Sequence, residues 1–469
     1  MRIKPAMGND DWRRWCRNVS ASLQRLLPLA AALAFSTLLP AESPEPADLR
    51  QILDRLQRLE QANQELREEV RALKAELAAR SGKTGDAAAP VEEKVAVLEN
   101  RVEEQAQTKV ESSQRLPVRL TGMVLFNSFL NSTNNGGAQY PTVAVPGYDR
   151  NAGGSMRQTT IGLNYGPSPA VLGGKISGSV VMDFWGGTGQ PLDQLVRLRT
   201  GIIAIDWTTR RVAAGLDKPI FSPREPTSLA QVGVSPLTGA GNLWLWIPQV
   251  RFEQDVHLSG TSSLRAQIGV VQTRENYAQT SAPGYKPPDV ASARPGLEGR
   301  FQFGHGSDRR VEIAPGFHFS TSHVAYKSVP SRLFSLDWFV RPLTSIEFSG
   351  AFFDGQNVAP LGAGGAGPGF AAFLGTDVRP VHSTGGWGQL TYRLNQRLSF
   401  NFFSGQHDNR DFDLQSGMVS KNMLFGGNFF LRLAPNVILS FESSQVRTNR
   451  IGASTVLNNH YDLALAYLF

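Results

Sequence analysis

The chain has 469 residues, a formal net charge of +7 and one cysteine. No apolar run reaches the roughly 18 residues that a membrane-spanning helix needs; the longest extends from Leu26 to Pro40 and already contains Pro28. Because Cys16 precedes this run and is expected to be removed with it, the mature chain would have no disulfide, no thiol catalysis and no cysteine-ligated metal.

Positive charge is concentrated in the later part of the chain. Residues 1–114 carry 17 Lys/Arg and 18 Asp/Glu, which leaves 30 and 22 for residues 115–469, a net charge of +8 there. In a chain that also carries an export signal, we expect no nucleic acid partner. Excess positive charge in such a chain favours the attraction of anions.

Residues 1–41 are predicted to be a secretory signal peptide. Arg13, Arg14 and Arg17 precede the apolar run, and small residues follow at its end, up to Ala41. These small residues offer several cleavage positions, and the sequence does not choose among them. A membrane anchor is the alternative interpretation.

Residues 45–80 are predicted to form a coiled coil, because apolar residues recur at alternating spacings of three and four. The a and d positions are Leu49, Ile52, Leu56, Leu59, Asn63, Leu66, Val70, Leu73 and Leu77. Asn63 at an a position is typical of dimers. The stretch from Arg55 to Glu60, however, resembles the Arg-h-x-x-h-Glu signature of parallel trimeric coiled coils, where h is apolar, and we favour a trimer. The candidate trimerisation residues are Arg55, Leu56, Leu59, Glu60 and Asn63.

Residues 81–114 are predicted to be a linker followed by a second, shorter helix. Gly82, Gly85 and Pro90 interrupt the helical pattern, and an apolar stripe resumes it from Val91. We expect this segment to lie in the periplasm together with the coiled coil.

Residues 115–469 are predicted to be an all-β transmembrane barrel of about 16 antiparallel strands, because short segments of alternating polarity replace the helical period. The predicted strands are 117–131, 155–166, 173–186, 195–208, 211–220, 244–257, 263–275, 294–304, 309–322, 330–341, 344–355, 384–394, 397–408, 419–433, 437–448 and 457–469. Short turns alternate with long loops, among them 323–329, as in outer-membrane barrels. An even number of strands places both ends of the barrel on the periplasmic side.

One face of each predicted strand is apolar and is expected to face lipid, while the other lines a water-filled lumen. In segment 195–208, the residues assigned to the lipid face are Val196, Leu198, Ile202 and Ala204. The arginines assigned to the lumen are Arg197, Arg199, Arg251, Arg265 and Arg300. As a group they are predicted to form a path for anions. The alternative is a set of ion pairs that only brace the wall.

The last nine residues predict the closing strand of the barrel. The large apolar residues in this segment are Tyr461, Leu463, Leu465, Tyr467 and Phe469. They alternate with small or polar residues, and the sequence ends on the Phe. The pattern resembles the C-terminal assembly signal of bacterial outer-membrane proteins. It implies outer-membrane lipid and the barrel assembly machinery as partners.

Together, the signal peptide, the heptad segment and the sixteen strands resemble the DcaP-like trimeric porins of Gram-negative bacteria. The stretches from Arg157 to Leu163 and from Pro248 to Phe252 are similar to strand motifs of that group. The resemblance implies homotrimers in the outer membrane, a periplasmic coiled coil and passive uptake of small, preferentially anionic solutes such as dicarboxylates. The Gly-rich loop from Leu361 to Phe370 departs from the pattern.

In general porins the third long loop narrows the channel, and here that loop extends from Phe221 to Leu243. Ser222, Arg224 and Glu225 are its candidate constriction residues, and we expect Arg224 and Glu225 to face the pore. A lid on the outer surface is the alternative.

We therefore expect an outer-membrane porin, without metal or cofactor, that passes small anionic or polar solutes. A sugar-type porin is one alternative, and a structural barrel that tethers the outer membrane to the periplasm is another. The sequence contains no Gly-x-Ser-x-Gly elbow and no His-Glu-x-x-His motif, so an enzyme is not expected.

Overall fold

The computed structural model describes residues 118–187, 194–272, 295–307, 310–324, 327–372 and 378–469. The predicted signal peptide, coiled coil and second helix lie outside the described residues, as do the candidate trimerisation residues. No helix among the described residues is long and apolar enough to cross a membrane.

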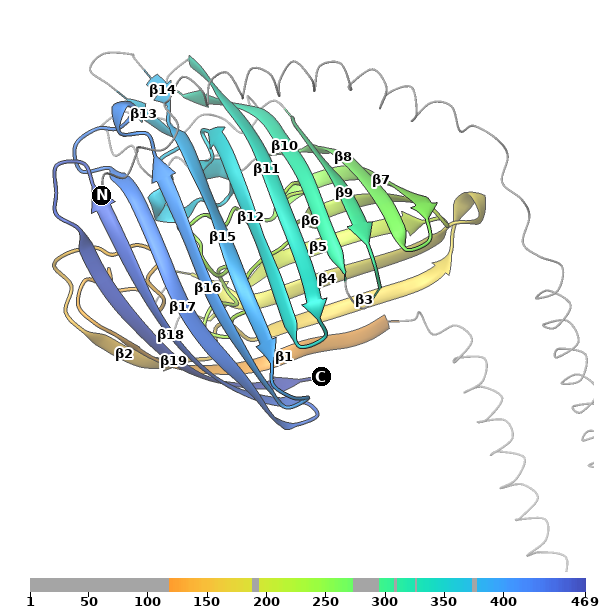
Figure 1. Cartoon of the computed structure of the whole chain (residues 1–469), viewed down its shortest axis with the longest axis horizontal. Helices are drawn as coiled ribbons and strands as arrows, with labels where there is room; N and C mark the ends of the chain where they lie inside the picture. The colour runs from red at the N-terminus through yellow and green to blue at the C-terminus, as the bar shows by residue number, and fades with distance from the viewer. Residues whose placement is uncertain (1–117, 188–193, 273–294, 308–309, 325–326, 373–377) are drawn as a thin grey trace, which may run out of the picture. The chain divides into compact units, whose positions relative to one another are not determined.

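The described residues form an antiparallel sheet that closes on itself (Figure 1). The strands are β1 (Val118–Asn131), β2 (Asn151–Ser155), β3 (Thr160–Pro169), β4 (Lys175–Gly186), β5 (Leu195–Asp206), β6 (Arg210–Asp217), β7 (Ile247–Ser259), β8 (Ser262–Val271), β9 (Gly296–His305), β10 (Val311–Val324), β11 (Lys327–Leu343), β12 (Ile346–Gln356), β13 (Phe370–Ala372), β14 (Val378–Pro380), β15 (His382–Arg393), β16 (Leu398–Asn409), β17 (Val419–Ala434), β18 (Val437–Arg450) and β19 (Val456–Leu468). Short 3₁₀ turns span Val171–Gly173, Ala359–Leu361, Gly364–Ala366 and Asp411–Asp413.

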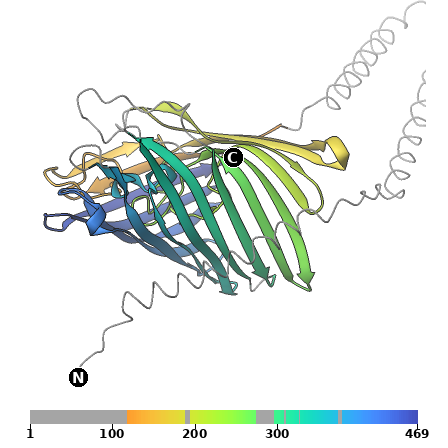
Figure 2. The same ribbon diagram turned by 90° about the horizontal axis from the view of Figure 1, so that it is seen from above.

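The ring contains sixteen strand positions. β2 and β3 both pair with β1, so they are two parts of one interrupted strand, and β13 and β14 form a separate small hairpin. Each remaining strand pairs with its neighbours in sequence, and β1 pairs with β19 from Met123↔Leu468 to Asn131↔His460. This last pairing closes the barrel, and Figure 2 shows the same ring from above. The predicted strand number is confirmed.

Phe469 completes the seam between the first and last strands. Its backbone nitrogen donates to the Gly122 carbonyl at 3.1 Å, and the nitrogen of Gly122 donates to the Phe469 carbonyl at 3.0 Å. A Cβ atom at Gly122 would collide with the backbone carbonyl oxygen of Thr160 on β3, and it would lie 2.6 Å from the Phe469 ring. Glycine is therefore required where the terminal aromatic ring covers β1.

Side chains alternate along the strands between an apolar outer face and a more polar inner face. In β19 and the residue after it, the five residues of the predicted assembly signal are exposed, whereas Asp462, Ala464 and Ala466 between them are buried. In β9, Leu297, Phe301 and Phe303 are exposed in the same way. The outer surface is therefore a continuous apolar belt.

β5 changes phase at a β-bulge. Its pairing with β4 skips Arg199, which is an extra residue in the ladder. Beyond the bulge, Ile203 is exposed on the outer face and Ala204 is buried. The assignment of Ile202 and Ala204 to the lipid face is therefore wrong, because one extra residue moves a period-two pattern to the opposite face.

The connections are sorted by length between the two ends of the barrel. One end carries the short connections and the two ends of the sheet, at Val118 and Leu468; we call it the short-turn end. The opposite, long-loop end carries longer connections such as 132–150 and 357–381. The predicted loop 323–329 is an exception, since β10 and β11 continue to Val324 and from Lys327.

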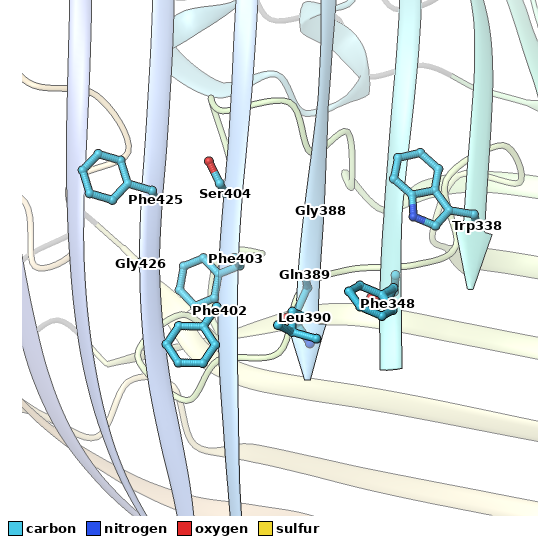
Figure 3. A pocket seen from close by; sticks show the side chains of 11 residues that line it. Trp338, Phe348, Gly388, Gln389, Leu390, Phe402, Phe403, Ser404, Phe425 and Gly426 are labelled. Atoms are coloured by element: carbon cyan, nitrogen blue, oxygen red, sulfur yellow. The ribbon is translucent and has the colours of Figure 1, made fainter. Parts of the chain in front are cut away.

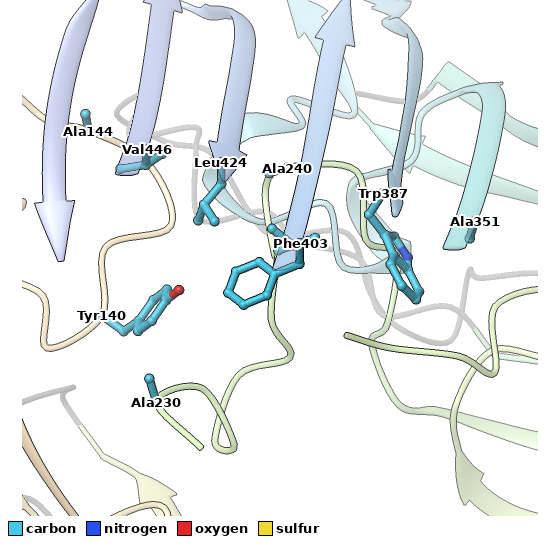
Figure 4. Packing of buried hydrophobic residues seen from close by; sticks show 10 residues of the cluster. Tyr140, Ala144, Ala230, Ala240, Ala351, Trp387, Phe403, Leu424 and Val446 are labelled. Atoms are coloured by element: carbon cyan, nitrogen blue, oxygen red, sulfur yellow. The ribbon is translucent and has the colours of Figure 1, made fainter. Parts of the chain in front are cut away.

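Long connections fold into the barrel and cover part of the inner wall (Figure 4). One buried cluster contains Tyr140 and Ala144 from the β1–β2 connection, Ala230, Leu237 and Ala240 from the β6–β7 connection, and Ala351, Trp387, Phe403, Leu424 and Val446 from the wall. A second joins Phe221 and Leu243 to Leu333, Phe353, Val358, Leu361 and Ala363. The inner wall therefore has an apolar core where loops cover it.

Candidate functional site

The β6–β7 connection, residues 218–246, crosses the inside of the barrel, and we call it the interior loop. Near its start, the nitrogen of Ile220 donates to Glu298 on β9 at 2.7 Å. In its middle, the amide of Asn127 on β1 donates to the Leu229 carbonyl at 2.9 Å. Because β1 and β9 are about half the ring apart in strand order, the interior loop spans the lumen.

Gln158 fixes the centre of the interior loop. Its Nε2 donates to the Ala230 carbonyl at 2.8 Å, and its Oε1 accepts from the nitrogens of Val232 and Gly233 at 2.6 and 2.8 Å. The sequence pattern predicts an unbroken strand over 155–166. The structure instead breaks it between β2 and β3, where Gln158 is buried inside.

Arg197 and Arg199 of β5 converge on one carboxylate, that of Asp183 on β4. The Nη2 of Arg197 lies 2.6 Å and the Nη1 of Arg199 lies 3.3 Å from Asp183 Oδ2. Both arginines also donate to carbonyls of the interior loop, Arg199 to that of Val232 at 2.6 Å. The ring of Trp246 lies 4.8 Å from the Arg199 guanidinium and 5.2 Å from that of Arg197. This cluster holds two positive charges against one acid.

Arg224 of the interior loop belongs to a second cluster in which cations outnumber acids. Its Nε lies 2.9 Å from Asp337 Oδ1 on β11, and its Nη2 binds Glu312 on β10. Arg300 on β9 binds the same Asp337 at 2.7 Å, and Arg310 binds Glu312. Three arginines therefore share two carboxylates.

Ser222 and Glu225 have different surroundings on the interior loop. Ser222 is buried. Glu225 binds Lys218 at 2.8 Å and accepts from Ser235 at 2.7 Å. Burial disfavours the charged carboxylate, but Lys218, the hydrogen bond from Ser235 and the charge of Arg199 outweigh it, so the pKa of Glu225 lies below its ordinary value.

Arg251 and Arg265, on β7 and β8, are balanced by acids. Arg251 lies 2.7 Å from both Asp217 and Glu253. Arg265 lies 2.6 Å from Asp255. Unlike the clusters around Asp183 and Asp337, these pairs carry no excess positive charge.

In the two cation-rich clusters the acids are buried, whereas the arginines other than Arg300 are more exposed. Among the side chains, Asp183, Asp337 and Glu312 are 0, 1 and 4% exposed, whereas Arg197 and Arg224 are 29 and 22% exposed. A solute in the lumen therefore meets guanidinium groups, with the carboxylates behind them. Exposed positive charge of this kind is the feature by which a pore can favour anions.

Two further arginines line the lumen at the short-turn end and were not predicted from the sequence. Arg341 of β11 and Arg393 of β15 share Glu347 of β12. A signal was present, because Arg341 follows Asp337 and Phe339 in steps of two and so lies in the same lumen-facing phase.

A hollow of about 670 Å³ lies across β11, β12 and β15–β17 (Figure 3). Its lining includes Trp338, Phe348, Leu390, Phe402 and Phe425. Phe348, Phe402 and Phe425 are exposed on the outer face of the barrel. The hollow therefore belongs to the apolar outer belt and not to the solute path.

Comparison with solved structures finds outer-membrane porins. The outer membrane channel DcaP of Acinetobacter baumannii matches with a TM-score of 0.60 and 15% identity, over 75% of this chain and 97% of that one. An anion-selective porin from Comamonas acidovorans matches with a TM-score of 0.49 and 10% identity, over 75% and 99%. OprB of Pseudomonas putida also has a TM-score of 0.49 and 10% identity, over 78% and 97%. No family model and no curated protein matches the chain. The described residues have the sixteen-stranded barrel fold of a DcaP-like porin.

Proposed function

We propose that this protein is an outer-membrane porin through which small hydrophilic solutes, preferentially anions, diffuse passively. The observation that carries the proposal is the exposure of Arg197, Arg199 and Arg224 to the lumen, with their acid partners buried behind them. Dicarboxylates are one class of solute that such a path would attract.

In this proposal the interior loop narrows the channel. Arg224 and Glu225 line the constriction from the loop, whereas Ser222 is buried and is not part of its surface. Arg300 is itself buried and braces the wall through Asp337. The proposed anion path therefore passes the predicted wall residues Arg197 and Arg199 but not the buried Arg300.

The rest of the chain is proposed to deliver the barrel to its place and assemble it. Residues 1–41 would direct export, and residues 45–80 would form a trimeric coiled coil in the periplasm, joined to the barrel by residues 81–114. The apolar outer belt would face outer-membrane lipid. The exposed face of β19 would be recognised by the barrel assembly machinery.

A sugar-type porin would need aromatic rings along the lumen. Phe403 is covered by loop residues in the first buried cluster. Phe339 lies between Arg224 and Arg341, with their guanidinium groups 5.3 and 5.4 Å from the ring centre. Neither ring is therefore placed as part of an aromatic row for sugars, which favours the anion channel.

A barrel that serves only as a tether is the second candidate, and the loop packing inside the wall favours it. The two buried clusters fill part of the space that water would otherwise occupy. Such a barrel would fold and anchor the periplasmic segment without conducting ions.

Single-channel recording of the mature protein in a planar bilayer under a salt gradient tests the proposal. We expect closure in three equal steps and a reversal potential that shows anion preference. A preference for cations would mean that the acids control the constriction. A folded, heat-modifiable barrel without conductance would favour the tether.

A further inference from the structure

The lumen wall near the short-turn end holds an arginine group separate from Arg197 and Arg199. Arg341 and Arg393 approach one oxygen of Glu347: the Nε of Arg341 and the Nη1 of Arg393 each lie 2.6 Å from its Oε1. Arg310, in the neighbouring β9–β10 connection, binds Glu312. We call Arg310, Arg341 and Arg393 the mouth cluster.

Phe339 connects the mouth cluster to the constriction. The guanidinium carbon of Arg224 lies 5.3 Å from the ring centre of Phe339, and that of Arg341 lies 5.4 Å from it. Glu312 makes a second connection, because it binds both Arg224 and Arg310. Cationic side chains therefore follow one another without interruption from the interior loop to the end of the barrel.

Exposure increases along this series towards the mouth. The side chain of Arg224 is 22% exposed, and those of Arg341, Arg393 and Arg310 are 33, 44 and 51% exposed. The two acids remain buried, Glu312 at 4% and Glu347 at 11%. Within this series, the most exposed guanidinium groups therefore lie at the short-turn end.

The mouth cluster also has hydrogen-bond donors to spare. Each guanidinium carries five N–H groups. The bonds to Glu347 occupy the Nε and Nη2 of Arg341 and the two terminal nitrogens of Arg393. The other N–H groups of these half-exposed side chains can donate to a carboxylate in the lumen, and such charge-assisted hydrogen bonds are stronger than neutral ones.

We propose that the mouth cluster is a second anion-binding station, which takes a small carboxylate at the short-turn end of the lumen. This inference rests on the proposed anion channel and adds to it a distinct site beyond the constriction. Because the station lies at one end of the lumen, beyond the constriction, a bound carboxylate would lie asymmetrically along the channel. Current carried by a carboxylate should therefore depend on the sign of the voltage.

The test is bilayer recording of the full mature protein in sodium acetate at about 10 mM, where the screening length is about 30 Å. The local charge of Arg341, Arg393 and Glu347 is +1; Arg341→Gln with Arg393→Gln makes it −1, and Glu347→Gln makes it +2. The measured quantity is the ratio of the larger to the smaller acetate current in the parent protein at voltages of equal size and opposite sign. We expect this ratio to fall roughly twofold or more in the double variant and to rise in Glu347→Gln. About 1 M salt, with a screening length near 3 Å, should remove both effects.

Arg447→Gln is the matched control, since Arg447 is exposed on the outer face of β18, over Phe425. It should leave the current ratio unchanged. If the double variant and Glu347→Gln both keep the parent ratio while heat-modifiable mobility shows folded barrels, the station does not exist. Absence of conductance in the parent protein would instead reject the channel itself.

Discussion

At the scale of single residues, Arg224 decides the charge of the proposed constriction. Arg224→Gln leaves Asp337 bound to Arg300 and Glu312 bound to Arg310, so the barrel should still fold. One unit charge about 4 Å from a passing ion contributes ~1 kcal/mol in water, favourable for an anion and unfavourable for a cation, so we expect the anion-to-cation permeability ratio to fall at least roughly fivefold. Reversal potentials under a salt gradient measure this ratio.

Arg447→Gln again provides the control for Arg224→Gln. It removes the same charge from the outer face of the barrel, and selectivity should not change. An equal loss of selectivity in both variants would show that overall net charge, and not the charge on the interior loop, determines selectivity.

Lowering the pH should protonate Glu225 only below the ordinary glutamate pKa of about 4.3. The folded pKa is lowered, so the stabilisation from its ion pair with Lys218 is fully present above the ordinary value. It is lost as the pH falls through the lower folded value. We expect anion preference to be constant down to about pH 5 and to rise below about pH 4, as this carboxylate is neutralised.

Glu225→Gln should have the higher anion preference already at neutral pH and should lack this acid-dependent rise. Recording both proteins across the acid range separates Glu225 from the other carboxylates of the lumen. A rise of the same size in the variant would assign the effect to another acid.

At the scale of the strand, the bulge in β5 gives adjacent residues opposite environments. Ile203 is exposed on the outer face, whereas Ile202 pairs with Ser179 on the inner face. Arginine on a lipid-facing position near mid-membrane costs about 2–4 kcal/mol. Because Ile203 lies three residues before the end of β5, we expect Ile203→Arg to lower the free energy of unfolding by at most that amount, and Ile202→Arg to lower it by much less.

Chemical unfolding of the two arginine variants in lipid vesicles measures the difference. The unshifted sequence pattern places Ile202 on the lipid face, so it predicts the reverse order. A larger cost at Ile202 than at Ile203 would therefore reject the bulge.

The same bulge shows what the sequence can and cannot predict. All sixteen strand positions follow from alternating polarity, because a wide barrel sorts residues between two faces along its whole wall. The shift at Arg199 and the break at Gln158 leave no such pattern, since each depends on contacts with the interior loop. Arg199 and Arg224 could be selected as lumen candidates, but their acid partners depend on register and loop path.

At the scale of the whole molecule, the barrel is closed by contacts between its own first and last strands. The pairing of β1 with β19 and the contact of Gly122 with Phe469 are both internal to residues 118–469. Folding of the barrel can therefore be tested separately from assembly into the proposed trimer.

Deletion of residues 45–110 should leave a folded barrel but weaken the trimer, because it removes the predicted coiled coil. We expect heat-modifiable mobility and the conductance of each step to be unchanged. The fraction of recordings that close in three equal steps should fall at least roughly tenfold at low protein concentration, since the coiled coil supplies association energy. Deletion of residues 81–90 alone keeps the heptads and is the control. If channels of the variant without residues 45–110 close in three steps as often as those of the parent protein, then the outer faces of the barrels hold the trimer together. The coiled coil would then have another role.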